Sequence, residues 1–180
     1  MSNAAHGSMT EADYLSFELG SEERNEFLDG VIVAMTGASK RHNEIGGSLF
    51  AALRVVAKAH GCRTSIEGVR LRLSESMHVY PDVMVACDDN DDPYAESAPC
   101  LIAEVLSPST KWIDHGRKRA AYLGLASLRH YLLINPEQEQ VEHYARFDAD
   151  STWTIALVGI GETLRLTCPP MDLALADIFA

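Results

Sequence analysis

The stretch VYPDVMVACDD, residues 79–89, is a short apolar strand that begins at a carboxylate, Asp82. Asp is depleted in strands because its short polar side chain bonds to local backbone groups, and the preceding Pro81 removes a ladder donor. A second stretch, CLIAEVLSPST at residues 100–110, places Glu104 inside an apolar run in the same way. Two apolar strands that each carry one acid predict a site shared between them.

The composition indicates one globular domain. The chain has 180 residues, of which 47% are apolar and 23% are charged, and this length suits one domain with a core. Residues 1–8, MSNAAHGS, are small and patternless, so we expect an expression leader followed by a single domain over residues 9–180. No apolar run approaches the roughly 18 residues of a membrane span, and no signal-peptide pattern opens the chain. We therefore expect a cytoplasmic protein without a membrane partner.

Charge and cysteine usage exclude several classes of protein. The 26 acidic and 15 basic residues give a net charge of −11, which opposes tight non-specific binding of nucleic acid by a monomer. A local basic groove or a metal-bridged phosphate contact is still compatible with this charge. The cysteines form no C-x-x-C pair, so they indicate neither a zinc knuckle nor a thioredoxin-like motif. We expect reduced, partly buried thiols at all four positions, which are Cys62, Cys87, Cys100 and Cys168.

The periodicities predict a mixed α/β sheet with helices on its faces. Thr10 is a plausible N-cap of a short helix, and Asp29-Gly30 is typical of a hairpin turn. A long helix ends at Gly61, and residues 64–73 alternate as one half-buried strand. The acidic segment 87–99 is expected to be a solvated loop, and the Glu104 strand to lie centrally in the sheet. The remaining expected elements are a helix within 114–125 and strands within 130–135, 140–147, 151–159 and 163–167.

Six segments in order carry a family resemblance. They lie at residues 25–35, 38–49, 80–85, 102–110, 114–122 and 131–135. Together they resemble the Uma-type family of predicted restriction endonucleases, formerly a domain of unknown function, in the PD-(D/E)xK superfamily. The resemblance runs from about Thr10 to the C-terminus. It implies a restriction-endonuclease-like α+β fold, which is a mixed β-sheet flanked by helices, with an N-terminal hairpin and a C-terminal antiparallel extension.

One position departs from the superfamily signature. Leu106 stands where that signature has lysine, so the usual cation is missing from the strand. The resemblance implies that a lysine on the following helix takes its role, and the matching residue here is Lys118. Lys118 and Tyr122 are four residues apart, so they share one helix face that could look back at the end of the preceding strand.

The resemblance also implies a metal site for phosphodiester hydrolysis. Mg²⁺ prefers hard oxygen ligands, which Asp82 and Glu104 would supply as carboxylates and Val105 as a main-chain carbonyl. Mn²⁺ could substitute for Mg²⁺. Lys118 would orient the attacking water or stabilise the transition state. Glu26 and His42 fall at positions where they could assist, Glu26 toward the metal and His42 toward phosphate or the leaving group.

We therefore expect a Mg²⁺-dependent endonuclease that acts on DNA, as a homodimer because two-fold symmetry matches the duplex. A non-catalytic nucleic-acid-binding or interaction module is the alternative, and RNA or branched DNA is another possible substrate. Each residue also has a reading without chemistry. Asp82 could bond turn amides, and Glu104 could form a metal-free salt bridge with Lys118. Glu26 and His42 could be ordinary surface side chains.

Overall fold

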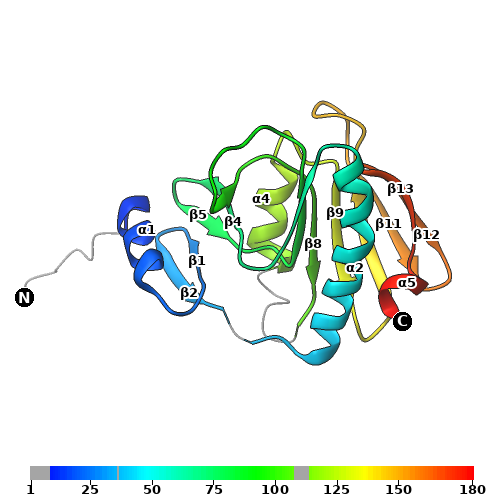
Figure 1. Ribbon diagram of the computed structural model, residues 1–180, viewed down its shortest axis with the longest axis horizontal. Coiled ribbons are helices and arrows are strands. Elements are labelled where there is room, and N and C mark those ends of the chain that lie inside the picture. Colours follow the sequence, from blue (N-terminus) through cyan, green and yellow to red (C-terminus); the bar gives the residue numbers. More distant parts are fainter. Residues whose placement is uncertain (1–8, 36, 108–113) are drawn as a thin grey trace, which may run out of the picture.

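The computed structural model describes residues 9–35, 37–107 and 114–180. Residues 1–8 lie outside this part, and their assignment as a leader stays a prediction. The strands form a six-stranded sheet in the order β11-β10-β9-β8-β6-β3, a five-stranded sheet in the order β2-β1-β5-β4-β7, and a separate β12-β13 pair. Helix α2 lies against the six-stranded sheet, while α1 and the β1-β2 hairpin lie at one end of the molecule (Figure 1). The mixed α+β architecture predicted from the sequence is confirmed.

The N-terminal half alternates helices with short strands. Its elements are α1 (Glu11–Gly20), β1 (Asn25–Leu28), β2 (Val31–Ala34), α2 (Lys40–Ala59), β3 (Arg63–Ile66), β4 (Arg70–Ser74), β5 (Met77–Val79), β6 (Val83–Ala86) and β7 (Ala95–Glu96). The predicted Thr10 cap is present, because its side chain accepts a hydrogen bond from the Asp13 amide at 3.2 Å. The predicted hairpin turn is also present, with positive φ at Asp29 (53°) and Gly30 (85°).

The C-terminal half supplies the central strand and the antiparallel extension. Its elements are β8 (Pro99–Val105), a π-helical turn η1 (Asp114–Lys118), α4 (Arg119–Leu123), β9 (His130–Asn135), β10 (Gln140–Ala145), β11 (Thr154–Gly159), β12 (Thr163–Thr167), β13 (Pro170–Ala174) and α5 (Ala176–Phe179). Every residue of β8 is buried, and the strand pairs antiparallel with β6 and parallel with β9. The predicted central position of the Glu104 strand is therefore confirmed.

Strand β8 divides the core into two clusters because alternate side chains point to opposite faces of a sheet. Leu101, Ala103 and Val105 pack with α2 residues such as Leu49 on one face. Ile102 packs on the other face with Tyr122 of α4 and with residues of the five-stranded sheet. Glu104 shares the parity of Ile102, so this alternation directs its carboxylate toward the α4 side.

Two strand predictions need correction. Residues 64–73 are two strands in different sheets, β3 and β4, because Glu67 and Gly68 have positive φ values of 41° and 69° and turn the chain between them. The acidic segment 87–99 is not wholly a solvated loop. It contains β7, which pairs parallel with β4. Glu96 in this strand is only 6% exposed and binds the Arg63 guanidinium.

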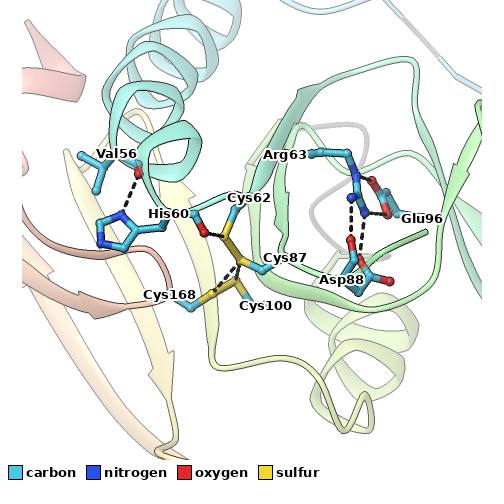
Figure 2. Close-up of a disulfide and its surroundings, with 9 residues drawn as sticks. All are labelled: Val56, His60, Cys62, Arg63, Cys87, Asp88, Glu96, Cys100 and Cys168. Atoms are coloured by element: carbon cyan, nitrogen blue, oxygen red, sulfur yellow. Dashed lines mark hydrogen bonds and ion pairs between the residues drawn. A yellow bond between two sulfur atoms is a disulfide. The ribbon is translucent and has the colours of Figure 1, made fainter. Parts of the chain in front are cut away.

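The expectation of reduced thiols is wrong for this structure. The four cysteines form two disulfides, Cys62–Cys87 and Cys100–Cys168, whose partners are 25 and 68 residues apart. Strand pairing of β3 with β6 sets Arg63 opposite Ala86, which brings the adjacent Cys62 and Cys87 together. Figure 2 shows the two disulfides side by side below the end of α2. Separations of this kind follow from the sheet topology, which the spacing of cysteines in the sequence does not reveal.

Among the residues described, no helix has the length and apolar character to cross a membrane.

Candidate functional site

Asp82 and Glu104 meet at the same end of the β6-β8 pair. Val83 lies opposite Ala103 in the antiparallel register, so Asp82, directly before β6, comes beside Glu104 near the end of β8. The Asp82 amide lies 3.4 Å from Glu104 Oε2, and the Val105 amide donates to Asp82 Oδ2 at 2.7 Å. Asp82 therefore accepts a hydrogen bond from the neighbouring strand, which differs from the turn-amide reading. The carbonyl role predicted for Val105 stays a prediction.

Glu104 is held by two side chains from the helical segment that follows β8. Tyr122 donates its hydroxyl to Glu104 Oε1 at 2.7 Å, and Lys118 Nζ lies 3.4 Å from the same oxygen. Lys118 ends the π-helical turn η1, and Tyr122 lies one turn later, in α4. Short π-helical turns are often found at functional sites. Burial, together with the negative charges of Glu104 and Glu26, raises the pKa of Tyr122 well above its usual value. Its hydroxyl therefore stays a proton donor.

Glu26 approaches the site from the N-terminal hairpin. Its Oε1 lies 2.7 Å from Lys118 Nζ and accepts a hydrogen bond from the Tyr80 amide at 3.2 Å. Glu26, Glu104 and Lys118 are only 5%, 3% and 5% exposed, respectively. A buried ammonium needs compensating carboxylates, and Glu26 and Glu104 supply them to Lys118. Glu26 is thus a buried partner of Lys118 and not an ordinary surface side chain.

His42 faces Asp82 from the first turn of α2. The turn begins at Ser39, whose side chain caps the helix by accepting from the His42 amide at 3.1 Å. The imidazole Nε2 lies 3.1 Å from Asp82 Oδ2. The hydrogen bond with Asp82 raises the pKa of His42, while burial acts in the opposite direction. Asp82 therefore favours the protonated form of the His42 imidazole.

Two residues of this site were missed as participants in the sequence analysis. Glu67 offers a carboxylate oxygen within 4.8 Å of ligand atoms of both His42 and Asp82, and its amide donates to the Asp82 carbonyl at 3.0 Å. The Glu-Gly pair at 67–68 was the available signal, because such a pair is typical of a turn with positive φ. Tyr122 was noted only for its helix face, and no local pattern indicates that its hydroxyl binds Glu104.

The chain is similar in sequence to known proteins. A family model described as "Putative restriction endonuclease", Uma2, matches residues 11–176. Two uncharacterized proteins of Synechocystis sp. (strain ATCC 27184 / PCC 6803 / Kazusa) are similar in sequence. The protein slr1290 is 30% identical over 170 residues, covering 93% of this chain and 89% of its own length. The protein sll1609 is 34% identical over 152 residues, covering 82% of this chain and 85% of its own length.

A solved structure shares the fold. It is a crystal structure described as a putative nuclease belonging to DUF820 from Anabaena variabilis ATCC 29413. The TM-score is 0.74 at 16% sequence identity, and the match covers 95% of this chain and 97% of the other. Because the family model spans nearly the whole described domain, the chain belongs to the Uma2 family, the "Putative restriction endonuclease" family, and has a nuclease-type fold.

Proposed function

We propose that the protein is an endonuclease that hydrolyses phosphodiester bonds in DNA with Mg²⁺, for which Mn²⁺ can substitute. One observation carries this proposal. Two acidic residues from neighbouring strands, Asp82 and Glu104, meet at one end of the β6-β8 pair, where Glu104 also contacts the buried ammonium of Lys118. Phosphodiester hydrolysis needs this combination, because negative charge develops on the phosphate and a water must be activated.

The donor set fits a hard divalent cation. Carboxylates outnumber cations along this cluster, since Asp82, Glu104, Glu26 and Glu67 face one ammonium and one imidazole. Oxygen-rich surroundings of this kind are what Mg²⁺ prefers. Asp82 and Glu104 would hold the ion, with the Val105 carbonyl as a further ligand, and Glu67 offers one more oxygen. The bound ion lowers the pKa of a water and neutralises charge on the phosphate.

The remaining residues of the site have roles that their contacts support. Lys118, fixed between Glu26 and Glu104, stabilises charge on the phosphate or orients the attacking water. Tyr122 fixes the Glu104 carboxylate through its hydroxyl. His42 orients Asp82 through Nε2. Its Nδ1 is buried without a hydrogen-bond partner among the described residues, so an enclosed water could satisfy this nitrogen.

We further propose that the working form is a homodimer, because each site is suited to cutting one strand and a two-fold axis matches duplex DNA. The chain mass is 19.7 kDa, so light scattering distinguishes a dimer from a monomer directly. A mass that stays near one chain across a wide concentration range contradicts the homodimer.

A non-catalytic nucleic-acid-binding module is the second candidate. The ionic contacts of Lys118 with Glu26 and Glu104 are made between protein groups alone, as in a structural salt bridge. The net charge of −11 also weakens general attraction to nucleic acid, although it leaves a local contact possible.

A cleavage assay separates these candidates. Purified protein is incubated with duplex DNA, single-stranded DNA and RNA in Mg²⁺ or Mn²⁺, beside the variants Asp82→Asn and Asp172→Asn. Asp172→Asn is the control, because it makes the same chemical change in an exposed ion pair with Arg165 on the surface. We expect cleavage by the parent and by Asp172→Asn, and its loss in Asp82→Asn. Binding without cleavage by the parent supports the second candidate, and equal cleavage by Asp82→Asn refutes the site.

A further inference from the structure

All four cysteines of the chain converge on one point, although they come from four separate places in the sequence. Cys62 follows α2, Cys87 follows β6, Cys100 lies in β8 and Cys168 follows β12. Besides the two disulfides, Cys87 Sγ lies 3.4 Å from Cys168 Sγ and 3.7 Å from Cys100 Sγ. The Sγ atoms of these three residues all lie within 4.8 Å of one another. Figure 2 shows the four sulfur atoms as one continuous cluster.

Backbone pairing and polar side chains hold this cluster independently of the S–S bonds. The segments of Cys62 and Cys87 are joined by the β3-β6 ladder and by Arg63, which binds Asp88 at 2.8 Å and Glu96 at 2.8 Å (Figure 2). Cys100 lies within the β6-β8 ladder. None of these contacts uses a sulfur atom, so they can hold three of the four thiols in place after reduction.

The fourth cysteine is held by a histidine pair. The amide of Thr167, next to Cys168, donates to His130 Nε2 at 2.9 Å. His130 Nδ1 in turn lies 2.9 Å from His143 Nε2, which fixes the ring because both histidines are buried in the sheet. The turn that carries Cys168 is therefore anchored to β9 and not to Cys100 alone.

The distances between the two disulfides match a metal site. In a tetrahedral site with metal–sulfur bonds of about 2.3 Å, neighbouring sulfur atoms lie about 3.8 Å apart. The contacts of 3.4 and 3.7 Å that Cys87 makes with Cys168 and Cys100 are close to that edge length. Cys62 lies outside this group of three and would complete the site only after its bond to Cys87 is reduced. Cys100 is only 8% exposed while Cys87 is exposed, so the cluster has a buried floor and one side open to solvent. An ion or a reductant can therefore reach the sulfur atoms through Cys87.

We propose that the reduced protein binds one Zn²⁺ ion through Cys62, Cys87, Cys100 and Cys168, and that the two disulfides are the oxidised, metal-free form of the same site. Four thiolates in a tetrahedral arrangement are a donor set that selects Zn²⁺ over the hard cations suited to the Asp82 site. This site needs no C-x-x-C motif, because the sheet supplies the proximity that such a motif supplies in a short loop.

The interconversion balances in atoms and electrons. Each disulfide takes two electrons and two protons from a dithiol reductant, which itself becomes a disulfide. The four resulting thiols release four protons when Zn²⁺ binds, because the thiolate is the ligand form. Oxidation of the loaded site by a disulfide oxidant restores the two S–S bonds and releases the ion. Metal content therefore reports the redox state of the cluster.

Metal titration of the full chain tests this proposal. The protein is reduced with a phosphine, freed of reductant without air, and titrated with Co²⁺ and then with Zn²⁺. We expect one equivalent of Co²⁺ per chain with thiolate-to-metal charge-transfer absorbance, displacement by Zn²⁺, and protection of all four thiols from alkylation. Protein left oxidised should give no such absorbance. Cys87→Ser should weaken binding on the order of 100-fold or more, because it removes one of four ligands.

Two control variants separate this site from its surroundings. His60→Ala removes an imidazole beside the cluster, whose Nδ1 lies 2.9 Å from the Val56 carbonyl (Figure 2). This variant should leave the cobalt spectrum unchanged. Asp82→Asn should also leave it unchanged, because that metal site uses oxygen ligands. If Cys87→Ser does not fold, protection of the parent's thiols from alkylation still tests the proposal. Reduced parent that shows no thiolate absorbance, or whose thiols stay fully alkylatable in Zn²⁺, overturns the proposal.

Discussion

The two ends of the β6-β8 pair carry opposite chemistry. At one end, before Val83, Asp82 and Glu104 present oxygen atoms, and at the other end Cys87 and Cys100 present sulfur atoms. The separation along β6 from Asp82 to Cys87 is about 16 Å at roughly 3.3 Å per residue. All residues of β6 between them are buried. The same ladder therefore positions hard ligands at one end and soft ligands at the other, with a dry core between them.

The comparison also shows how differently the two ends are held. Glu104 at the oxygen end is fixed by buried ionic contacts with Lys118 and by the Tyr122 hydroxyl. The sulfur end is fixed by covalent bonds and by the buried His130–His143 pair. Substitutions that remove a charge should therefore have their main effect at the oxygen end. Reduction of the disulfides and a lower solution pH should have their main effect at the sulfur end.

The largest effect is expected from Glu104→Gln. This change keeps the size of the side chain but removes a charge that the proposed metal needs, so cleavage should fall by about 10³-fold, equivalent to about 4 kcal/mol. The change also removes the ionic contact between Lys118 and Glu104, so the melting temperature should drop by roughly 5 °C. Cleavage rates and thermal melting measure both effects. An active parent whose rate is unchanged by Glu104→Gln would contradict the site.

Lys118→Met should lower cleavage by about 10²-fold, the range for loss of a charge-stabilising group. The single variant also strips the buried Glu26 and Glu104 of their shared cation, which costs stability. The double variant Lys118→Met with Glu26→Gln restores much of the charge balance. Single-turnover rates on this folded double variant isolate the chemical step. Recovery of the parent rate there would make Lys118 a structural cation.

Acidification should weaken the sulfur end. Burial, followed by electrostatic interactions with the His143 imidazole and the Arg129 guanidinium, lowers the pKa of His130 from 6.5 to about 4. Unfolded chains therefore bind more protons than the folded protein in this window, so stability is full above pH 6.5 and is lost as the pH falls toward 4. Lowering the pH from 7 to 4.5 should cost roughly 2 kcal/mol through His130. The free energy of unfolding, obtained with denaturant at both pH values, measures this loss of stability.

The variant His130→Asn supplies the control for that prediction, because it removes the titrating group while keeping a neutral side chain that can hydrogen-bond Thr167. Its loss of stability between pH 7 and pH 4.5 should be smaller than that of the parent. An identical pH dependence in parent and variant would show that other groups, and not His130, cause the acid sensitivity.

The smallest effect is expected for coupling between the two ends. Mutations more than about 10 Å apart without shared partners add within about 0.5 kcal/mol. Unfolding free energies of Cys87→Ser, Glu104→Gln and the double variant, all measured on reduced protein, should therefore be additive within that limit. Coupling well above it would mean that the β6-β8 ladder transmits strain from one end to the other.

Local patterns in the sequence were sufficient for most of the fold. The Thr10 cap, the Asp29-Gly30 turn and the period of α2 depend on near neighbours in the chain, so they are visible without the tertiary structure. The burial of Glu104 in a central strand was also predictable, because an acid in an apolar run stands out. The turn at Glu67 was missed because the alternation on its C-terminal side extends the apparent strand through it.

What the sequence determined by itself is the identity and local setting of each donor: an acid at the start of one strand, an acid within the next, and a lysine on the helix that follows. Only the tertiary structure decided which donors share a site. The π-turn sets Lys118 and Tyr122 against Glu104, the hairpin adds Glu26, and the β3-β6 ladder together with the β12 turn gathers the four cysteines. These contacts join residues far apart in the chain, and their register comes from core packing, which no local pattern encodes.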